Sequence, residues 1–196
     1  MSQKRKLLII DVETGGLDAS KQSILSLAAV VWHAGAIEDH YYTLIAEPEI
    51  IAEEGALKVN KLTIEQVQDE GVTPTAAFNA LQSMLLKHDM RSDVRLVGHN
   101  VAFDVTFLKR LLRLAGKTDK EYGRLFSYRS LCTQAGALLL EQAGRLDLPG
   151  GSASLDSLVK LWGVKLDRTD GHNALADAYA TVQVLNKELT MIGGLR

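Results

Sequence analysis

The sequence predicts an α/β protein with a mixed sheet flanked by helices. Three observations lead to this prediction. The first quarter of the 196-residue chain carries three strand-like apolar segments joined by short turns. After residue 90, two strand-like segments alternate with helix-like ones. No repeat, low-complexity tract or Gly/Ser linker interrupts the chain, so residues 1–196 are expected to form a single domain.

The first three strands are expected to form an antiparallel meander. Leu7–Ile10 is a run of aliphatic residues, typical of a strand that is buried on both faces. The glycines at 15 and 16 turn the chain, and Ser23–His33 and Ile37–Ala46 predict two further strands. The short break at Ala34-Gly35 is too brief for anything but a hairpin connection.

Helical patterns begin at about Ala52. Thr63 opens a short helix, and Thr73-Pro74 starts a longer one, because threonine caps helix N-termini and proline fits the first helical position. Apolar residues at helical spacing follow at positions 77, 81, 84 and 85.

The second half of the chain supplies two more strands, each followed by a helix. Val94–Val97 predicts a short strand, with a helix from about Val101 to Gly116. Phe126–Leu131 predicts the fifth strand, and a helix follows it through Leu140. The last helix is expected over residues 173–190. The predicted sheet therefore has five strands, three in a meander and two alternating with helices.

Composition limits the possible environments and partners. Apolar residues make up 46% of the chain, and the net charge of −2 excludes binding of nucleic acid through bulk positive charge. The single cysteine, Cys132, rules out an internal disulfide and favours a reducing compartment. The apolar stretch Ile24–Trp32 is too short to span a bilayer, and no secretory signal precedes the first strand. We expect a cytoplasmic protein without membrane contact.

Two carboxylates follow directly after the first strand. Asp11 and Glu13 are separated by one residue, so in an extended chain their side chains point to the same face, about 7 Å apart along the strand. Like charges at a buried strand end repel each other, and a shared divalent cation would remove that repulsion. The alternative is a solvated turn that happens to carry acids.

A third acid lies in the helix predicted after Val97. Asp104 falls on the border of the apolar stripe that contains Leu108 and Leu111. An aspartate that faces a core must be paired, hydrogen-bonded or bound to metal. The segment before it, Gly98-His99-Asn100, lies in a strand-to-helix turn, where α/β sheets commonly place their sites. The alternative is a first-turn acid that complements the helix dipole.

The final helix repeats this pattern. Asp177 lies within a stripe of small apolar residues that includes Ala174 and Ala178. His172 precedes the helix, so it is a candidate general base beside a core-facing acid. Together, the four acids could hold two divalent cations in the arrangement that serves displacement at phosphorus. Ligands that are all oxygen favour Mg²⁺ or Mn²⁺ over structural zinc.

These motifs, in this order and spacing, resemble the DEDDh (DnaQ-like) exonuclease superfamily, which includes the DNA polymerase III epsilon proofreading subunit and RNase T. The resemblance covers the chain from Leu7 to about Leu189, and Ala56–Thr63 is similar to the family's segment between the third strand and the next helices. The residues that carry it are Asp11-x-Glu13-Thr14, His99-Asn100-x-x-Phe103-Asp104 and His172-x-x-x-x-Asp177.

The resemblance implies an RNase H-like fold and a role for each acid. Asp11 would bridge two divalent cations, Mg²⁺ or Mn²⁺. Glu13 and Asp177 would complete the site of the ion that activates the nucleophile, and Asp104 would support the second ion. His172 would deprotonate the attacking water.

The resemblance also implies a substrate. The enzyme would be a 3′-to-5′ exonuclease that acts on single-stranded DNA or RNA ends, with DNA favoured, and releases 5′-mononucleotides. Thr14, Leu17 and Asn100 are the candidate substrate contacts. An epsilon-like role with a polymerase partner is the favoured interpretation, and RNase T-like trimming of RNA ends is the alternative.

Two features depart from the family pattern or leave alternatives open. Many relatives carry Asp-Thr near the end of the fifth strand, where this chain has Cys132-Thr133. Basic residues between positions 109 and 124 could track a phosphate backbone, although a solvated helix face is the favoured interpretation. They are Lys109, Arg110, Arg113, Lys117, Lys120 and Arg124.

Two other functional classes compete with the exonuclease hypothesis. A haloacid-dehalogenase-type phosphatase also places an acid after its first strand, but it needs a second aspartate where this chain has Glu13. A catalytically inactive RNase H-like module that binds nucleic acid or a polymerase would be favoured by loss of a ligating acid. All four acids and His172 are present, which favours an enzyme.

Overall fold

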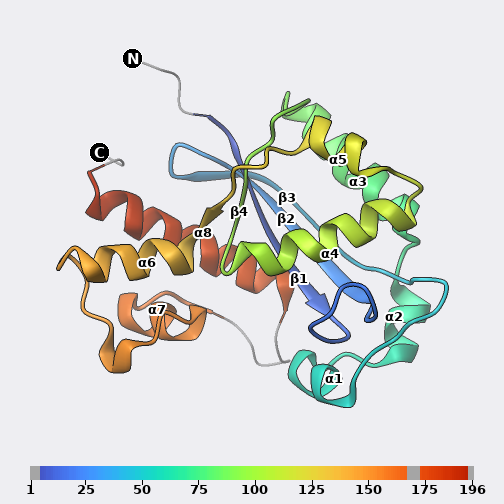
Figure 1. Cartoon of the computed structure of the whole chain (residues 1–196), viewed down its shortest axis with the longest axis horizontal. Coiled ribbons are helices and arrows are strands. Elements are labelled where there is room, and N and C mark those ends of the chain that lie inside the picture. Colours follow the sequence, from blue (N-terminus) through green and yellow to red (C-terminus); the bar gives the residue numbers. More distant parts are fainter. Residues whose placement is uncertain (1–4, 167–172, 194–196) are drawn as a thin grey trace.

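The sheet has the predicted five strands. A computed structural model describes residues 5–166 and 173–193, and it confirms the α/β class with a mixed sheet in the order β3-β2-β1-β4-β5 (Figure 1). The strands are β1 (Leu7–Thr14), β2 (Ile24–His33), β3 (Ala36–Leu44), β4 (Leu96–Gly98) and β5 (Leu131–Cys132).

The direction of the strands determines where a site can form. β1, β2 and β3 are the antiparallel meander, whereas β4 runs parallel to β1, with Leu8 opposite Leu96 and Ile9 opposite Val97. The carboxyl ends of β1 and β4 therefore lie at the same edge of the sheet. β4 ends at Gly98, which lies level with Ile10 of β1. The last four residues of β1, Asp11–Thr14, therefore have no β4 residue beside them.

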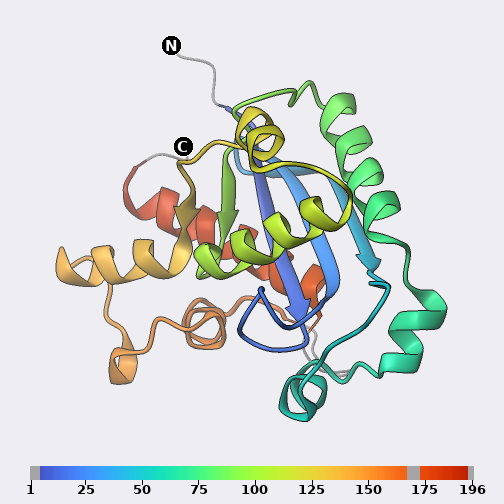
Figure 2. The same ribbon diagram turned by 45° about the vertical axis from the view of Figure 1, so that its right-hand side comes forward.

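Helices surround the sheet. They are α1 (Glu54–Asn60), α2 (Ile64–Glu70), α3 (Pro74–Lys87), α4 (Val101–Leu114), α5 (Asp119–Leu125), α6 (Thr133–Gln142), α7 (Leu155–Trp162) and α8 (Ala174–Met191). The longest of them, α8, lies behind the sheet in Figure 1, while α4 crosses in front of it. Figure 2 shows the same order of layers from a second direction.

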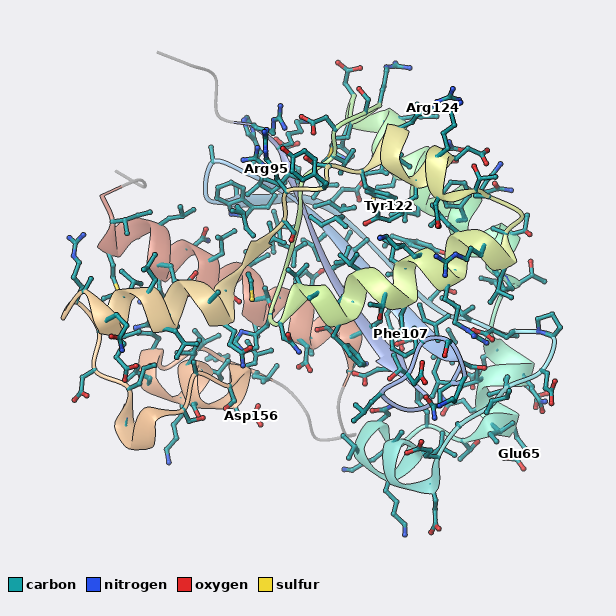
Figure 3. All side chains as sticks on the ribbon, viewed as in Figure 1. Glu65, Arg95, Phe107, Tyr122, Arg124 and Asp156 are labelled. Atoms are coloured by element: carbon teal, nitrogen blue, oxygen red, sulfur yellow. The ribbon has the colours of Figure 1, made fainter. Side chains whose placement is uncertain are left out.

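Alternation along β1 divides the core into two parts. Leu8, Ile10 and Val12 point to the face covered by α3 and α4, where Phe107 is fully buried (Figure 3). Leu7 and Ile9 point to the opposite face and pack against α8. Odd-numbered residues of β1 therefore face α8. The next two odd positions are Asp11 and Glu13.

The predicted strand over Phe126–Leu131 is wrong in its extent. Only Leu131 and Cys132 form β5, and Phe126 makes an isolated bridge to Val94. The apolar character of this segment has another cause, because Phe126 ends α5 and is buried against the core with 1% of its surface exposed. Tyr128, in the middle of the predicted strand, is 83% exposed.

Two helices were not predicted, although each carries a local signal. Thr118 and Glu121 form a capping box at the start of α5. Ser154 caps α7 by accepting a hydrogen bond from the backbone N–H of Ser157. Across the described residues, every helix falls short of the length and apolar character that crossing a membrane would require.

Candidate active site

The site is built at the carboxyl end of β1. Asp11 and Glu13 both point toward α8, as the alternation of the strand dictates. Glu13 is buried, with 8% of its surface exposed, and Asp11 is half-buried. Asp11 and Glu13 therefore lie on the same face of β1, as predicted, and the alternative of a solvated turn is wrong.

Asp177 reaches the same place from α8. Asn173 caps this helix by accepting hydrogen bonds from the N–H groups of Leu175 at 3.0 Å and Ala176 at 3.3 Å. Asp177 follows in the first turn and is 5% exposed. Small residues on its face of α8, Ala174 and Ala178, are fully buried against the sheet and allow the helix to approach closely.

The three carboxylates form one cluster. One oxygen from each of Asp11, Glu13 and Asp177 lies within 4.8 Å of the others. Residues that are 166 positions apart along the chain thus offer oxygen ligands to a common point. Carboxylate oxygens are the ligands that Mg²⁺ and Mn²⁺ prefer.

Asp104 enters from the opposite side of the sheet. α4 begins directly after β4, and Asn100 precedes it in a left-handed conformation with φ 64°. Because β4 ends early, the Asp104 carboxylate can accept a hydrogen bond from the backbone N–H of Val12 at 3.2 Å, between the two acids of β1. Asp104 is 3% exposed, so it is a core-facing acid rather than a solvated first-turn residue.

Burial raises the pKa of Asp104 well above 3.8, and the negative charge of Glu13 raises it further. Hydrogen bonds from the N–H groups of Asp104 itself and Val12 lower it without compensating. The dominant charge acting on Asp104 is therefore of its own sign. A divalent cation between these acids would offset that repulsion, and the clustered carboxylate oxygens fit such an ion.

His172 lies outside the described residues, so its role as general base stays a prediction. The helix that follows it is nevertheless described from Asn173 onward. Asp177 lies five residues after His172 in the chain and belongs to the acidic cluster.

The candidate substrate contacts differ in exposure. Leu17 is 85% exposed, and Asn100 is also exposed, so a ligand could reach both. Thr14 is buried: its hydroxyl donates to the Gly16 carbonyl at 2.7 Å, and its own carbonyl accepts from the Asn60 amide at 3.0 Å. Thr14 therefore shapes the loop that presents Leu17.

An internal ion pair holds this loop on α4. Arg110 donates to both oxygens of Glu47, at 2.8 and 2.6 Å, and also to the Ala19 carbonyl at 3.1 Å. Glu47 additionally accepts from the Ser23 hydroxyl and the Ile24 N–H. The loop between β1 and β2 is thus tied at its middle and at its end. Sequence reasoning assigned Arg110 only to a basic strip.

Most of that strip is engaged in contacts within the protein. Arg113 pairs with Asp119, and the ammonium of Lys109 lies 5.0 Å from the centre of the Tyr122 ring, between α4 and α5 (Figure 3). Lys117 lies over Phe78, with 5.7 Å between its ammonium and the ring centre. Arg124 is on the outer side of α5. The structure thus agrees with the favoured interpretation of a helix surface.

His99 lies next to the site and was not among the site residues predicted from the sequence. Its Nδ1 lies 3.0 Å from the Thr133 hydroxyl, and its Nε2 is buried. Burial lowers the pKa of His99, and a hydrogen bond with the Ala153 backbone and the charge of Asp177 oppose that shift. His99 therefore lies close to the acidic cluster, in surroundings that disfavour its protonated form. Its position in the motif with Asn100 was the signal that could have identified it.

The departure at Cys132 has a structural meaning. Cys132 occupies the N-cap of α6, and its side chain makes no capping hydrogen bond there. Thr133, which the family pattern retains, contacts His99 and donates to the Gly98 carbonyl at 3.4 Å. The N-cap of α6 thus lacks a side-chain hydrogen bond, whereas Thr133 links the start of this helix to the end of β4.

The strand order and the acidic edge of β1 together define the class of RNase H-like nucleases. A family model described as an exonuclease, of the RNase T type, matches residues 8–185. The chain belongs to this exonuclease family and to the DnaQ-like 3′-to-5′ exonuclease superfamily.

Relatives with similar sequences support this assignment. The chain is 26% identical over 185 residues to the DNA polymerase III subunit epsilon of Rickettsia typhi, covering 94% of this chain and 73% of that protein. It is 28% identical over 193 residues to the epsilon subunit of Aquifex aeolicus, covering 93% and 79%. Against the PolC-type DNA polymerase III of Thermotoga maritima, the identity is 27%, and 12% of that protein is covered.

Solved structures share the fold. E. coli exonuclease I, in complex with a dT13 oligonucleotide, matches with a TM-score of 0.79 at 18% identity. The match covers 96% of this chain but 42% of the exonuclease I chain. Exonuclease X, in complex with 5′-overhanging duplex DNA, matches with a TM-score of 0.63 at 24% identity, covering 95% of this chain and 93% of that chain.

Proposed function

We propose that this protein is a metal-dependent 3′-to-5′ exonuclease that degrades single-stranded nucleic acid, DNA in preference to RNA, and releases 5′-mononucleotides. The observation that carries the proposal is the cluster of Asp11, Glu13 and Asp177, with Asp104 beside it. Membership in the exonuclease family supports the reaction class.

Four carboxylates from three elements would hold two divalent cations, Mg²⁺ or Mn²⁺. Asp11, at the centre of the carboxyl edge, would contact both ions. Glu13 and Asp177 would share one of them with Asp11, and Asp104 would support the other. When bound, the cations would stabilise the negative charge that develops on the phosphate oxygens and on the leaving oxygen.

The remaining steps belong to side chains of the chain. His172 would accept the proton of the attacking water, which requires a neutral imidazole at the working pH. Leu17 and Asn100 would contact the terminal nucleotide, because both are exposed at the ends of the segments that carry Asp11 and Asp104. Thr14 would act by fixing the loop that carries Leu17.

Two arguments favour DNA and a polymerase partner. The relatives with similar sequences are DNA polymerase III epsilon subunits and PolC-type polymerases. The exonuclease I and exonuclease X structures hold DNA. We therefore propose an epsilon-like protein that acts in the cytoplasm, with a polymerase as a candidate partner. RNase T-like trimming of RNA ends remains the alternative.

A degradation assay with matched oligonucleotides tests the proposal. Single-stranded DNA and RNA of one sequence, each labelled at the 5′ end, are incubated with the protein and Mg²⁺ or Mn²⁺. The expected result is a ladder that shortens one nucleotide at a time from the 3′ end, faster for DNA, and stops in EDTA. The Asp11→Asn variant is the control for a contaminating nuclease. Intact oligonucleotides with both metals would contradict the proposal, and faster loss of RNA would favour end trimming.

A further inference from the structure

A second concave site lies away from the acidic cluster, between β5, α6 and the end of α8. It encloses a cavity of about 200 Å³. The α6 and α8 helices run side by side there (Figure 1). Its lining is apolar apart from a few side chains, and we call it the α6–α8 groove. It is lined by Leu131, Cys132, Thr133, Gly136, Leu139, Leu140, Leu185, Glu188, Leu189 and Ile192.

The rim of the α6–α8 groove exposes large apolar side chains. Leu139 is 72% exposed and Ile192 is 58% exposed, and Leu131 adds a third at 38%. Exposed apolar side chains grouped around one groove are a feature of interaction surfaces.

The groove also contains a buried carboxylate. Glu188 is 8% exposed, and its Oε1 atom is buried without a hydrogen-bond partner among the described residues. Burial raises the pKa of Glu188 to about 8. Cys132 is the other titratable side chain in the lining. A carboxyl group in this environment lacks the cationic or N–H partner that buried acids normally have.

Gly136 makes room for this carboxylate. It lies within α6, where glycine is less favourable than alanine. A Cβ at this position would lie 2.8 Å from one Glu188 oxygen and 2.9 Å from the other. The absence of a side chain at this position of α6 therefore provides the space that the Glu188 carboxylate occupies.

We propose that the α6–α8 groove is a docking site for a protein partner that inserts a lysine side chain, with its methylene stem against the leucines and its ammonium on Glu188. Charge complementarity determines this occupant. A lysine has an apolar stem and a cationic end. The stem would contact the apolar rim of the groove, and the cationic end would reach the Glu188 carboxylate at its base. The cavity volume suits one long side chain.

The docking site is separate from the nuclease site. Asp177 and Glu188 lie on the same helix, eleven residues apart, which corresponds to about 16 Å along the helix axis. The inference therefore does not depend on the proposed catalytic function. A partner bound in the groove would leave the acidic cluster accessible.

The test uses the whole chain and two short peptides. Acetyl-Ala-Leu-Lys-Leu-Ala-amide is the probe, and the same peptide with norleucine in place of lysine is its control. Binding is followed by NMR of the leucine and isoleucine methyl groups. Measured above pH 8, where the Glu188 carboxyl is ionised, the lysine peptide should perturb Leu139 and Ile192 and bind about tenfold or more tightly than the norleucine peptide.

Variants of the chain identify the groups responsible. Glu188→Gln should remove the preference for lysine while leaving nuclease activity unchanged. Gly136→Ala should weaken binding because its Cβ enters the space beside Glu188. Gly123→Ala, whose Cβ would meet nothing within 4 Å, is the matched control and should bind normally. Leu139→Asp changes an exposed position, so it should fold and lose the peptide.

Three results would overturn the proposal. Equal affinity for the lysine and norleucine peptides would remove the role of Glu188. Perturbed methyl groups outside the groove would place the peptide elsewhere. A concentration-dependent dimer of the chain that Leu139→Asp abolishes would identify a second copy, not a separate partner, as the occupant.

Discussion

Glu47 and Asp104 are both buried carboxylates, and the protein treats them in opposite ways. The Glu47 side chain is 1% exposed and receives two hydrogen bonds from Arg110, together with donors from Ser23 and Ile24. Asp104 is 3% exposed, accepts from the Val12 N–H, and has Glu13 as a charged neighbour that raises its pKa. One acid is neutralised by the fold, and the other is held beside a charge of its own sign.

This difference distinguishes an acid that stabilises the fold, Glu47, from acids that are placed to bind a ligand. The Glu47–Arg110 pair stabilises the loop that follows β1, and the pair raises the pKa of Arg110 further. The cluster of Asp11, Glu13 and Asp177 instead brings three carboxylate oxygens within 4.8 Å of one another, and the charge of Glu13 also acts on Asp104. Such a cluster makes chemical sense as a ligand set for cations, and it should cost stability when no cation is bound.

The largest expected effect concerns activity. Asp11→Asn should reduce the rate of 3′ degradation about a thousandfold or more, since loss of metal-based charge stabilisation costs several kcal/mol and each 1.36 kcal/mol is tenfold in rate. Its melting temperature in EDTA should be equal to or higher than that of the wild type, because one of several repelling carboxylates is gone. A rate assay and a thermal melt on the same preparation check both. Loss of activity through unfolding would contradict the metal-ligand role.

The next largest effect concerns stability and should appear at the Glu47–Arg110 ion pair. Arg110→Ala should destabilise the fold by about 3–5 kcal/mol, because it leaves the Glu47 charge buried without its partner. Denaturant unfolding of the metal-free protein measures this free energy. If Arg110→Ala cost less than about 1 kcal/mol, the pair would not be the anchor that we infer.

A smaller effect should appear in the pH dependence of stability. The folded-state pKa of Asp104 lies above its ordinary value of 3.8, so the stability that this group contributes is present below 3.8 and is lost as the pH rises through the folded-state pKa. In EDTA, Asp104→Asn should therefore be more stable than the wild type at about pH 8, and the gain should shrink toward pH 4.

Glu188 also contributes to the pH dependence of stability, with the same sign as Asp104, and comparing Asp104→Asn with the wild type removes that contribution. Glu188 has a pKa raised to about 8, but it is present in both proteins and cancels in the difference. Chemical denaturation at several pH values gives the result. A stability difference that grows as the pH falls would have the wrong sign for a raised pKa of Asp104.

The smallest effect is expected on the exposed side of α4. Arg113 pairs with Asp119, and the two side chains are 59% and 69% exposed. Arg113→Ala should change the free energy of unfolding by no more than about 1 kcal/mol, as is usual for exposed ion pairs. It is the matched control for Arg110→Ala, one turn away on the same helix. A large loss of DNA binding in Arg113→Ala would revive the hypothesis of a phosphate-tracking strip.

How much of this could be predicted from the sequence depends on the range of the interactions. Asp11 and Glu13 were predictable because strand alternation and the end of an apolar run are local properties. Asp104 and Asp177 were predictable because each acid interrupts an apolar stripe at helical spacing. Their convergence was expected from the family resemblance, and the structure brings Asp11, Glu13 and Asp177 together.

Features that depend on distant partners were not predictable. Nothing near Arg110 indicates Glu47, which lies 63 residues earlier, and the exposed or buried state of a basic residue follows from such contacts. The strand predicted at Phe126–Leu131 was wrong because Phe126 is buried by tertiary packing at the end of α5 and not by a sheet. The role of His172 stays a prediction.

The most direct test of the central claim is a calorimetric titration of the metal-free protein with Mn²⁺. We predict saturable binding that also raises the melting temperature, and we predict that Asp11→Asn and Asp177→Asn lose it. The matched control is Asp39→Asn, because Asp39 pairs with Lys87 and His88, away from the carboxyl end of β1. This variant should bind Mn²⁺ like the wild type. Absence of saturable binding, or equal binding by the Asp11 variant and the wild type, would contradict the assignment of the acidic cluster as a metal centre.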